Sequence, residues 1–344
     1  MPASNLYLVM ALCFIATAAI AELTRKNAMR LGLVQVPNER SSHSVPTPSG
    51  GGLAIVLVSC CAGLFVSSGL FGIVLVCALV GLLGFLDDRL NLPAKLRLIV
   101  HFCLTSAVVS ILFFGMTLDH GLTVYAWVLA PLIVIAGVWW INLFNFMDGI
   151  DGLASSQAIF MTAASFSLAS GNVSASGLES FLLLDLVVLA CASGFLVLNW
   201  PPARIFMGDA GSNFLAMAIF CIFLGLIAAG RLDMPAALIL SALFVCDATM
   251  TLLTRILRGE SGFKAHRTHA YQKLSRLPGG HRRTTLIYLA INLCWIYPLA
   301  YLAQTFDNWG WGLFAAACIP IVILCILVGA GLVDTSPSRK ILHE

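Results

Sequence analysis

Long runs of apolar residues follow one another along almost the whole chain, separated by short polar segments. A helix needs about 20 apolar residues to cross a bilayer, and it satisfies its own backbone hydrogen bonds there. We therefore expect eleven membrane-spanning helices, at about 5–23, 52–69, 71–86, 98–116, 122–141, 153–170, 181–198, 213–229, 234–254, 285–303 and 310–333. Because only 10% of the 344 residues are charged, the chain cannot form a water-soluble surface. The sequence predicts one all-α integral membrane domain over residues 1–344.

The basic residues lie almost entirely on one side of these predicted spans. Eighteen of the 19 Lys and Arg residues fall in alternate connecting segments, and only Arg231 falls on the other side. Basic segments remain in the cytoplasm, so we expect a periplasmic N-terminus, a cytoplasmic C-terminus and a place in the inner (cytoplasmic) membrane. The cytoplasmic segments are then 24–51, 87–97, 142–152, 199–212, 255–284 and 334–344. The net charge of +3 gives no reason to expect a nucleic-acid partner.

Two adjacent aspartates, Asp87 and Asp88, end the third predicted span, and Arg89, Lys95 and Arg97 follow them. Neighbouring carboxylates repel each other, so both stay ionised only beside cations or a metal ion. The alternative is that these polar residues simply stop the helix at the membrane surface, but lysines would serve that purpose as well. We therefore expect the two aspartates to belong to a functional site.

Four polar residues recur at every third position in the cytoplasmic segment 142–152: Asn142, Asn145, Asp148 and Asp151. They would align on a 3₁₀ turn and drift slowly across one face of an α-helix. A glycine follows each aspartate, which allows the chain to turn and a ligand to approach the backbone. The segment contains no Lys or Arg, so its carboxylates need an external cation. This favours Mg²⁺ bound together with phosphates.

Asp209 lies between Gly208 and Gly211 where the eighth predicted span begins. Asp209 or Ser212 could be an ordinary helix N-cap. Free backbone N–H groups and the helix dipole also make such a position suitable for binding an anion. We expect a functional role here in addition to capping.

The basic segment 255–283 and the loop 40–52 are further candidates for contact with phosphate. His266, Arg267 and His269 can donate hydrogen bonds to phosphate oxygens, although basic residues beside a membrane often only bind anionic lipids or set orientation. The loop 40–52 contains His43 and Thr47 and is rich in glycine, but it lacks the Gly-Lys-Ser/Thr ending of a nucleotide-triphosphate loop.

Four motifs occur in order on the predicted cytoplasmic side: PTPSGGG, LDDRLNLPAKLR, NLFNFMDGIDGLA and FMGDAGS. In these residues the sequence resembles the polyprenyl-phosphate N-acetylhexosamine-1-phosphate transferases of glycosyltransferase family 4, including the type that initiates O-antigen synthesis. The resemblance covers nearly the whole chain. It implies transfer of a sugar 1-phosphate from a UDP-N-acetylhexosamine to undecaprenyl phosphate in the lipid bilayer, with release of UMP.

The resemblance also implies roles for the acidic residues. Asp209 corresponds to the magnesium-binding aspartate, and Asn145 is the expected second residue of the metal site, with Mn²⁺ as a substitute for Mg²⁺. Asp87 and Asp88 correspond to the pair beside the acceptor phosphate, one of them the proposed base. Asp148 matches another active-site acid. Direct attack by the lipid phosphate is favoured over a phospho-sugar enzyme.

The remaining expected contacts are to the substrates. Asp151 matches the position that contacts uracil. Lys95 and Arg97 match cations that follow the aspartate pair, and Arg267 matches a basic residue that binds the pyrophosphate. The other expected substrate-binding residues are His266, His269, Thr47 and His43.

One departure from the family concerns the sugar. Many members carry a His-x-His-His cluster where this chain has His269-Ala270-Tyr271-Gln272. We therefore expect a modified sugar, such as N-acetylfucosamine or N-acetylquinovosamine, in lipopolysaccharide O-antigen synthesis. The alternative function is a membrane transporter for a phosphorylated metabolite, which would place its polar residues near the bilayer midplane on repeated halves. The oligomeric state is open, with a homodimer as one option.

Overall fold

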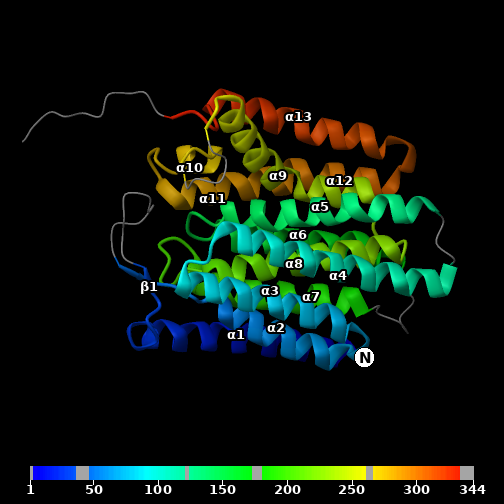
Figure 1. Ribbon diagram of the computed structural model, residues 1–344, viewed down its shortest axis with the longest axis horizontal. Helices are drawn as coiled ribbons and strands as arrows, with labels where there is room; N and C mark the ends of the chain where they lie inside the picture. Colours follow the sequence, from blue (N-terminus) through cyan, green and yellow to red (C-terminus); the bar gives the residue numbers. More distant parts are fainter. Residues whose placement is uncertain (1–2, 36–45, 121–123, 173–179, 261–265, 334–344) are drawn as a thin grey trace, which may run out of the picture.

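The computed structural model describes residues 3–35, 46–120, 124–172, 180–260 and 266–333. Its long helices lie roughly parallel to one another (Figure 1). The helices are α1 (Ala3–Leu31), α2 (Gly52–Val66), α3 (Phe71–Leu90), α4 (Ala94–His120), α5 (Val124–Phe146), α6 (Leu153–Ala169), α7 (Ser180–Asn199), α8 (Gly208–Ala228), α9 (Met234–Leu257), α10 (Ala270–Leu274), α11 (Gly280–Ile291), α12 (Tyr297–Thr305) and α13 (Gly310–Val328). A π-helical segment, Asn292–Ile296, joins α11 to α12. The strands β1 (Val34–Gln35) and β2 (Thr47–Pro48) form an antiparallel pair before α2.

Nine helical segments among the described residues are long and apolar enough to cross a membrane. One of them is the continuous segment Gly280–Thr305, which contains α11 and α12. The helices α2 and α6 are also apolar but shorter, with 15 and 17 residues. The chain is thus an all-α, multi-pass membrane protein, as the sequence predicts. The count of eleven spans and the orientation of the termini stay predictions.

The helix α8 lies near the middle of the bundle, and most of its residues are buried (Figure 1). Glycines allow α2 and α3 to approach its N-terminal turn closely. A Cβ atom at Gly84 of α3 would lie 2.3 Å from the Asp209 carbonyl oxygen, and one at Gly52 of α2 would lie 2.3 Å from the Gly211 Cα. Small residues permit this backbone approach between membrane helices. Packing therefore fixes the position of Asp209.

The segment leading into α2 is hydrogen-bonded to the loop before α8. The Phe206 N–H donates to the Pro48 carbonyl (2.8 Å), and the Gly51 N–H donates to the Phe206 carbonyl (3.0 Å). The Gly52 N–H donates to the Met207 carbonyl (2.9 Å). Two of the four sequence motifs thus form one structural unit.

The turn after α3 brings α4 close to Asp87. Asn91 adopts the left-handed conformation with φ of 50°, which asparagine tolerates better than most residues. Its N–H donates to the Asp87 carbonyl (2.9 Å), and α4 begins three residues later. This tight turn places Arg97, on the first turn of α4, beside the end of α3.

Candidate active site

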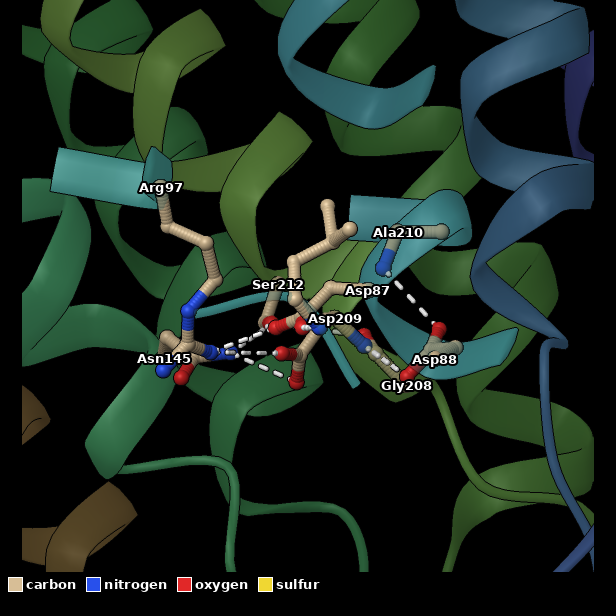
Figure 2. A network of polar contacts seen from close by, with 9 residues as sticks. Asp87, Asp88, Arg97, Asn145, Gly208, Asp209, Ala210 and Ser212 are labelled. Atoms are coloured by element: carbon tan, nitrogen blue, oxygen red, sulfur yellow. Dashed lines mark hydrogen bonds and ion pairs between the residues drawn. The ribbon is translucent and has the colours of Figure 1, made fainter. Parts of the chain in front are cut away.

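Asp209 is the centre of a polar cluster that draws on four helices (Figure 2). The Asn145 side-chain amide donates to Asp209 Oδ1 (2.9 Å) and to the Ser212 hydroxyl (2.9 Å). The Arg97 Nη1 lies 3.5 Å from Asp209 Oδ2. About a third of the Asp209 side chain remains exposed, at 30%. The carboxylate is therefore held in place while part of it faces open space.

The adjacent aspartates Asp87 and Asp88 have different partners. Asp87 is 7% exposed, and it accepts hydrogen bonds from Arg97 Nη1 (2.5 Å) and from the Leu92 N–H (2.8 Å). Asp88 instead accepts from the Asp209 N–H (3.0 Å) and, more weakly, from the Ala210 N–H (3.3 Å). Asp87 thus closes the turn between α3 and α4, and Asp88 caps α8, as Figure 2 shows.

Gly208 is required by this arrangement. Its φ of +74° lies in the left-handed region, and a Cβ atom there would lie 2.6 Å from Asp88 Oδ2. Any side chain at position 208 would displace the carboxylate that caps α8.

Of the two expected cations of this motif, only Arg97 contacts the acids. It is shared between Asp87 and Asp209. Lys95 is exposed and has no hydrogen-bond or ion-pair partner in the part of the chain that the structure describes. Among the described residues, a single guanidinium therefore contacts both carboxylates.

Asp148 lies in the turn after α5, partly buried, and its carboxylate accepts no hydrogen bond from any described residue. Burial and the nearby carboxylates of Asp209, Asp88 and Asp151 raise its pKa well above the ordinary value. Loss of hydration and like charges both disfavour the ionised form. Asp148 thus holds a proton more readily than an ordinary aspartate does.

Asp151 is bound within the protein by residues that lie outside the sequence motifs. Its Oδ2 accepts from the Ala203 N–H (3.0 Å), and its Oδ1 lies 3.1 Å from His281 Nδ1. Its carbonyl accepts from the Thr285 hydroxyl (3.0 Å). Asp151 therefore links the turn after α5 to the start of α11, and a contact to uracil stays a prediction.

The histidine loop, residues 266–272, lies against the end of α5. The rings of His266 and His269 have centroids 4.8 Å apart. His269 is 2% exposed, and its Nδ1 lies 3.8 Å from Asp247 Oδ1. Burial, together with His269 and Arg255, lowers the pKa of His266 to about 4, so its ring is neutral at pH 7. Arg267 is partly buried, and its carbonyl accepts from Arg276 Nη2.

Of the two expected residues of the loop 40–52, the structure describes only Thr47. Thr47 belongs to β2, where it is paired with Gln35. His43 lies outside the described residues. Their contacts with substrate stay predictions.

Two residues that hold the site together, Asn199 and His281, belong to no sequence motif. Asn199, at the end of α7, accepts from the Gly152 N–H (3.1 Å) and donates to the Ile205 carbonyl (3.0 Å). Asp247, by contrast, is visible in the sequence as an acidic residue deep in an apolar run, which makes it a functional candidate. In the structure it holds the histidine loop. Nothing in the spacing of His281 or Asn199 marks them.

The described acids do not enclose a cation by themselves. No group of three or more His, Cys, Asp or Glu side chains in the described residues converges closely enough to hold a metal ion. Mg²⁺ usually binds one or two carboxylates plus water and substrate phosphates, and it does not need an all-protein cage. A partly exposed Asp209 beside an amide and a guanidinium fits that kind of site.

Comparisons with known proteins agree with this chemistry. The family described as Glycosyl transferase family 4 matches residues 70–227. The chain is 29% identical to the probable undecaprenyl-phosphate N-acetylglucosaminyl 1-phosphate transferase of Bacillus subtilis, covering 79% of this chain and 78% of that protein. It is 28% identical to the undecaprenyl-phosphate alpha-N-acetylglucosaminyl 1-phosphate transferase of Yersinia pestis, covering 76% and 75%.

A third relative is the phospho-N-acetylmuramoyl-pentapeptide-transferase of Halalkalibacterium halodurans, at 30% identity over 78% of this chain and 89% of that protein. Together these matches place the chain among membrane-embedded transferases. It belongs to the polyprenyl-phosphate N-acetylhexosamine-1-phosphate transferase superfamily, within glycosyl transferase family 4.

Proposed function

We propose that the protein transfers a sugar 1-phosphate, from a UDP-linked N-acetylated hexosamine, to undecaprenyl phosphate and releases UMP. The observation that carries the proposal is the convergence of Asp88, Arg97, Asn145 and Asp209, from four different helices, at one end of a membrane bundle. Phosphoryl transfer depends mainly on positioning and charge stabilisation, which such a cluster can supply. The named activities of the relatives support the same reaction.

An apolar groove beside the cluster suits the lipid acceptor. It has a volume of about 370 Å³ and lies between α4, α5 and α9. Its lining includes Leu98, next to Arg97, and Asn142 and Phe146, which flank Asn145 in the sequence. We propose that the polyprenyl tail lies in this groove with its phosphate at Arg97.

We propose that Asp209 and Asn145 hold Mg²⁺, with Mn²⁺ as a substitute. When bound, the ion would neutralise phosphate oxygens and so reduce the repulsion between donor and acceptor. The protein groups would then orient the reactants: Arg97 would pair with phosphate oxygens, and Asp87 or Asp88 would position the acceptor. Asp148, with its raised pKa, is a further group able to take up a proton. We favour direct attack by the lipid phosphate on the β-phosphorus of the donor.

The cellular role is part of the proposal. The one-sided distribution of Lys and Arg supports an active site facing the cytoplasm in the inner membrane. We propose that the product starts a lipid-linked surface glycan of the O-antigen type. The transporter alternative has no support from the family.

The decisive experiment incubates purified protein with undecaprenyl phosphate, Mg²⁺ and a panel of UDP-sugars, and measures UMP release and the lipid product. We expect lipid-dependent UMP release with at least one UDP-N-acetylhexosamine. UMP release that does not require the lipid, or none with any sugar of the panel, would contradict the proposal.

A further inference from the structure

The carboxylate of Asp247 is completely buried in α9 and is surrounded by hydrogen-bond donors. Its Oδ1 accepts from the Ala270 N–H (2.8 Å), and its Oδ2 accepts from the Tyr271 N–H (3.0 Å) and the Tyr288 hydroxyl (2.6 Å). The Thr251 hydroxyl lies 3.4 Å from Oδ1. These contacts fix the backbone of the histidine loop at positions 270 and 271. The buried Asp247 carboxylate thereby fixes the direction in which the Tyr271 side chain points.

The Tyr271 side chain points away from solvent and reaches the end of α5. It is 0% exposed, and its hydroxyl donates to the Phe146 carbonyl (2.8 Å). Gly149 permits this approach, because a Cβ atom there would lie 2.1 Å from the Tyr271 hydroxyl oxygen. The contact therefore joins two segments of the chain that are 125 residues apart.

The Phe146 carbonyl occupies a sensitive position in the chain. Asn145, whose amide holds Asp209, precedes it, and Asp148 follows it by two residues. A shift of this turn would move both groups relative to Asp209. A misplacement of about 1 Å at a reacting centre can lower a rate about 100-fold.

We propose that Tyr271 is a positioning residue: its hydroxyl latches the Phe146–Gly149 turn and so keeps Asn145 and Asp148 in register with Asp209. The catalytic part of this inference rests on the proposed function. A positioning role for Tyr271 also gives a different interpretation of the His269-Ala270-Tyr271-Gln272 segment from the expected role in sugar recognition. A tyrosine that replaced a sugar contact would have to face the substrate, whereas Tyr271 is fully buried between its own loop and α5.

The test replaces Tyr271 by phenylalanine, which keeps the ring and removes only the hydroxyl. We expect kcat to fall about tenfold for every accepted UDP-sugar, with KM for those sugars changed less than about twofold, because a shifted turn affects the reaction step more than donor binding. Hydrogen exchange of the amides in 143–149 should become faster. Tyr297→Phe is the matched control, because its hydroxyl contacts Ser167 (2.9 Å) at an exposed position away from this loop.

Gly149→Ala disrupts the same contact, between the Tyr271 hydroxyl and the Phe146 carbonyl, from the side of the α5 turn. The added methyl group should break the latch, so this variant should lose at least as much activity as Tyr271→Phe. Since both changes remove one interaction, the double variant should be no worse than Gly149→Ala alone. Additive losses would overturn the latch.

The remaining outcomes are equally distinct. A change in preference among UDP-sugars in Tyr271→Phe would show a sugar contact and overturn the positioning role, as would unchanged kcat together with unchanged exchange of 143–149. If the wild-type protein transfers no sugar at all, the proposed function fails. The exchange comparison between Tyr271→Phe and Tyr297→Phe then still decides whether the hydroxyl holds the turn.

Discussion

Asp209 and Asp247 are both helix aspartates near the candidate site, but their surroundings differ. Asp209 has an amide at 2.9 Å, a guanidinium at 3.5 Å that it shares with Asp87, and the carboxylate of Asp88 against its own N–H. Its side chain is 30% exposed. In the described part of the chain, Asp87 and Asp209 thus share one cation, and the Asp209 carboxylate is partly exposed.

The Asp247 carboxylate has no exposed surface, and both of its oxygens accept strong hydrogen bonds. Its donors are two backbone N–H groups and the hydroxyls of Tyr288 and Thr251, and the contact of His269 is longer, at 3.8 Å. Buried polar groups with complete hydrogen bonding fix one conformation. The difference indicates that Asp209, which is incompletely neutralised, is available to a ligand. Asp247, whose hydrogen bonds are all made, stabilises the fold instead.

The largest expected effect comes from Asp209→Asn, which keeps the shape and removes the charge. UMP release should fall on the order of 10²–10³-fold, the usual cost of removing one group that stabilises developing charge. Loss of repulsion with Asp88 should leave the melting temperature unchanged or slightly higher. Near-normal turnover with unchanged Mg²⁺ dependence would instead make Asp209 a helix cap only.

Asp247→Asn should have the opposite pattern. The amide can accept fewer hydrogen bonds, and each buried donor left without an acceptor costs about 1–3 kcal/mol in free energy of unfolding. Thermal melts in detergent should show a large loss of stability, while activity measured well below the melting temperature should fall less than in Asp209→Asn.

Asp185→Asn is the matched control for this change. Asp185 is also fully buried, but its Oδ2 accepts only from Ser165 (2.7 Å) and its Oδ1 has no partner in the described residues. It should lose much less stability than Asp247→Asn. An Asp247→Asn protein with a normal melting temperature and no activity would place Asp247 in the chemistry and break the comparison.

The fold was largely predictable because lipid permits few alternatives. Apolar runs of about 20 residues must form helices, so the predicted spans coincide with helices over most of their lengths. The short helix α10 and the π-helical segment Asn292–Ile296 were not predicted. Both depend on contacts between distant segments, such as Asp247 with the N–H groups of α10, which leave no periodic pattern in the sequence.

The candidate site was predictable where chemistry leaves a local pattern. Adjacent acids mark Asp87 and Asp88. The three-residue spacing of polar residues marks Asn145, and nearby glycines mark Asp209. The structure brings these four residues together. Sequence spacing could not show that Arg97, and not Lys95, turns inward. Nor could it show that a tyrosine at position 271 is buried, because burial depends on how α5 and the histidine loop pack.

The smallest expected effect concerns Asp148, which resembles Asp209 in having acidic neighbours but accepts no hydrogen bond from a described residue. Its raised pKa means that the folded protein holds this proton more tightly than the unfolded chain does. From a pH of about 4, the ordinary carboxyl value, up to the raised pKa, the unfolded state therefore binds fewer protons. Stability must then fall as the pH rises through this range.

Asp148→Asn removes that titration. Without metal, the melting temperature of the variant should therefore fall less steeply between pH 5 and pH 8 than that of the wild-type protein. Each 1 kcal/mol of difference in the free energy of unfolding corresponds to about 2–4 °C. In the wild-type protein, Mg²⁺ should take over from the proton as the neutralising charge. Its stabilising effect should therefore grow with pH, and Na⁺ at matched ionic strength should not reproduce it. The variant should show a weaker pH dependence of the Mg²⁺ effect. If the melting temperatures of the wild-type and variant proteins depend equally on pH, Asp148 is ionised over the whole range. Its acidic neighbours would then not raise its pKa, and Asp148 would be as fully ionised as an acid whose hydrogen bonds are all made.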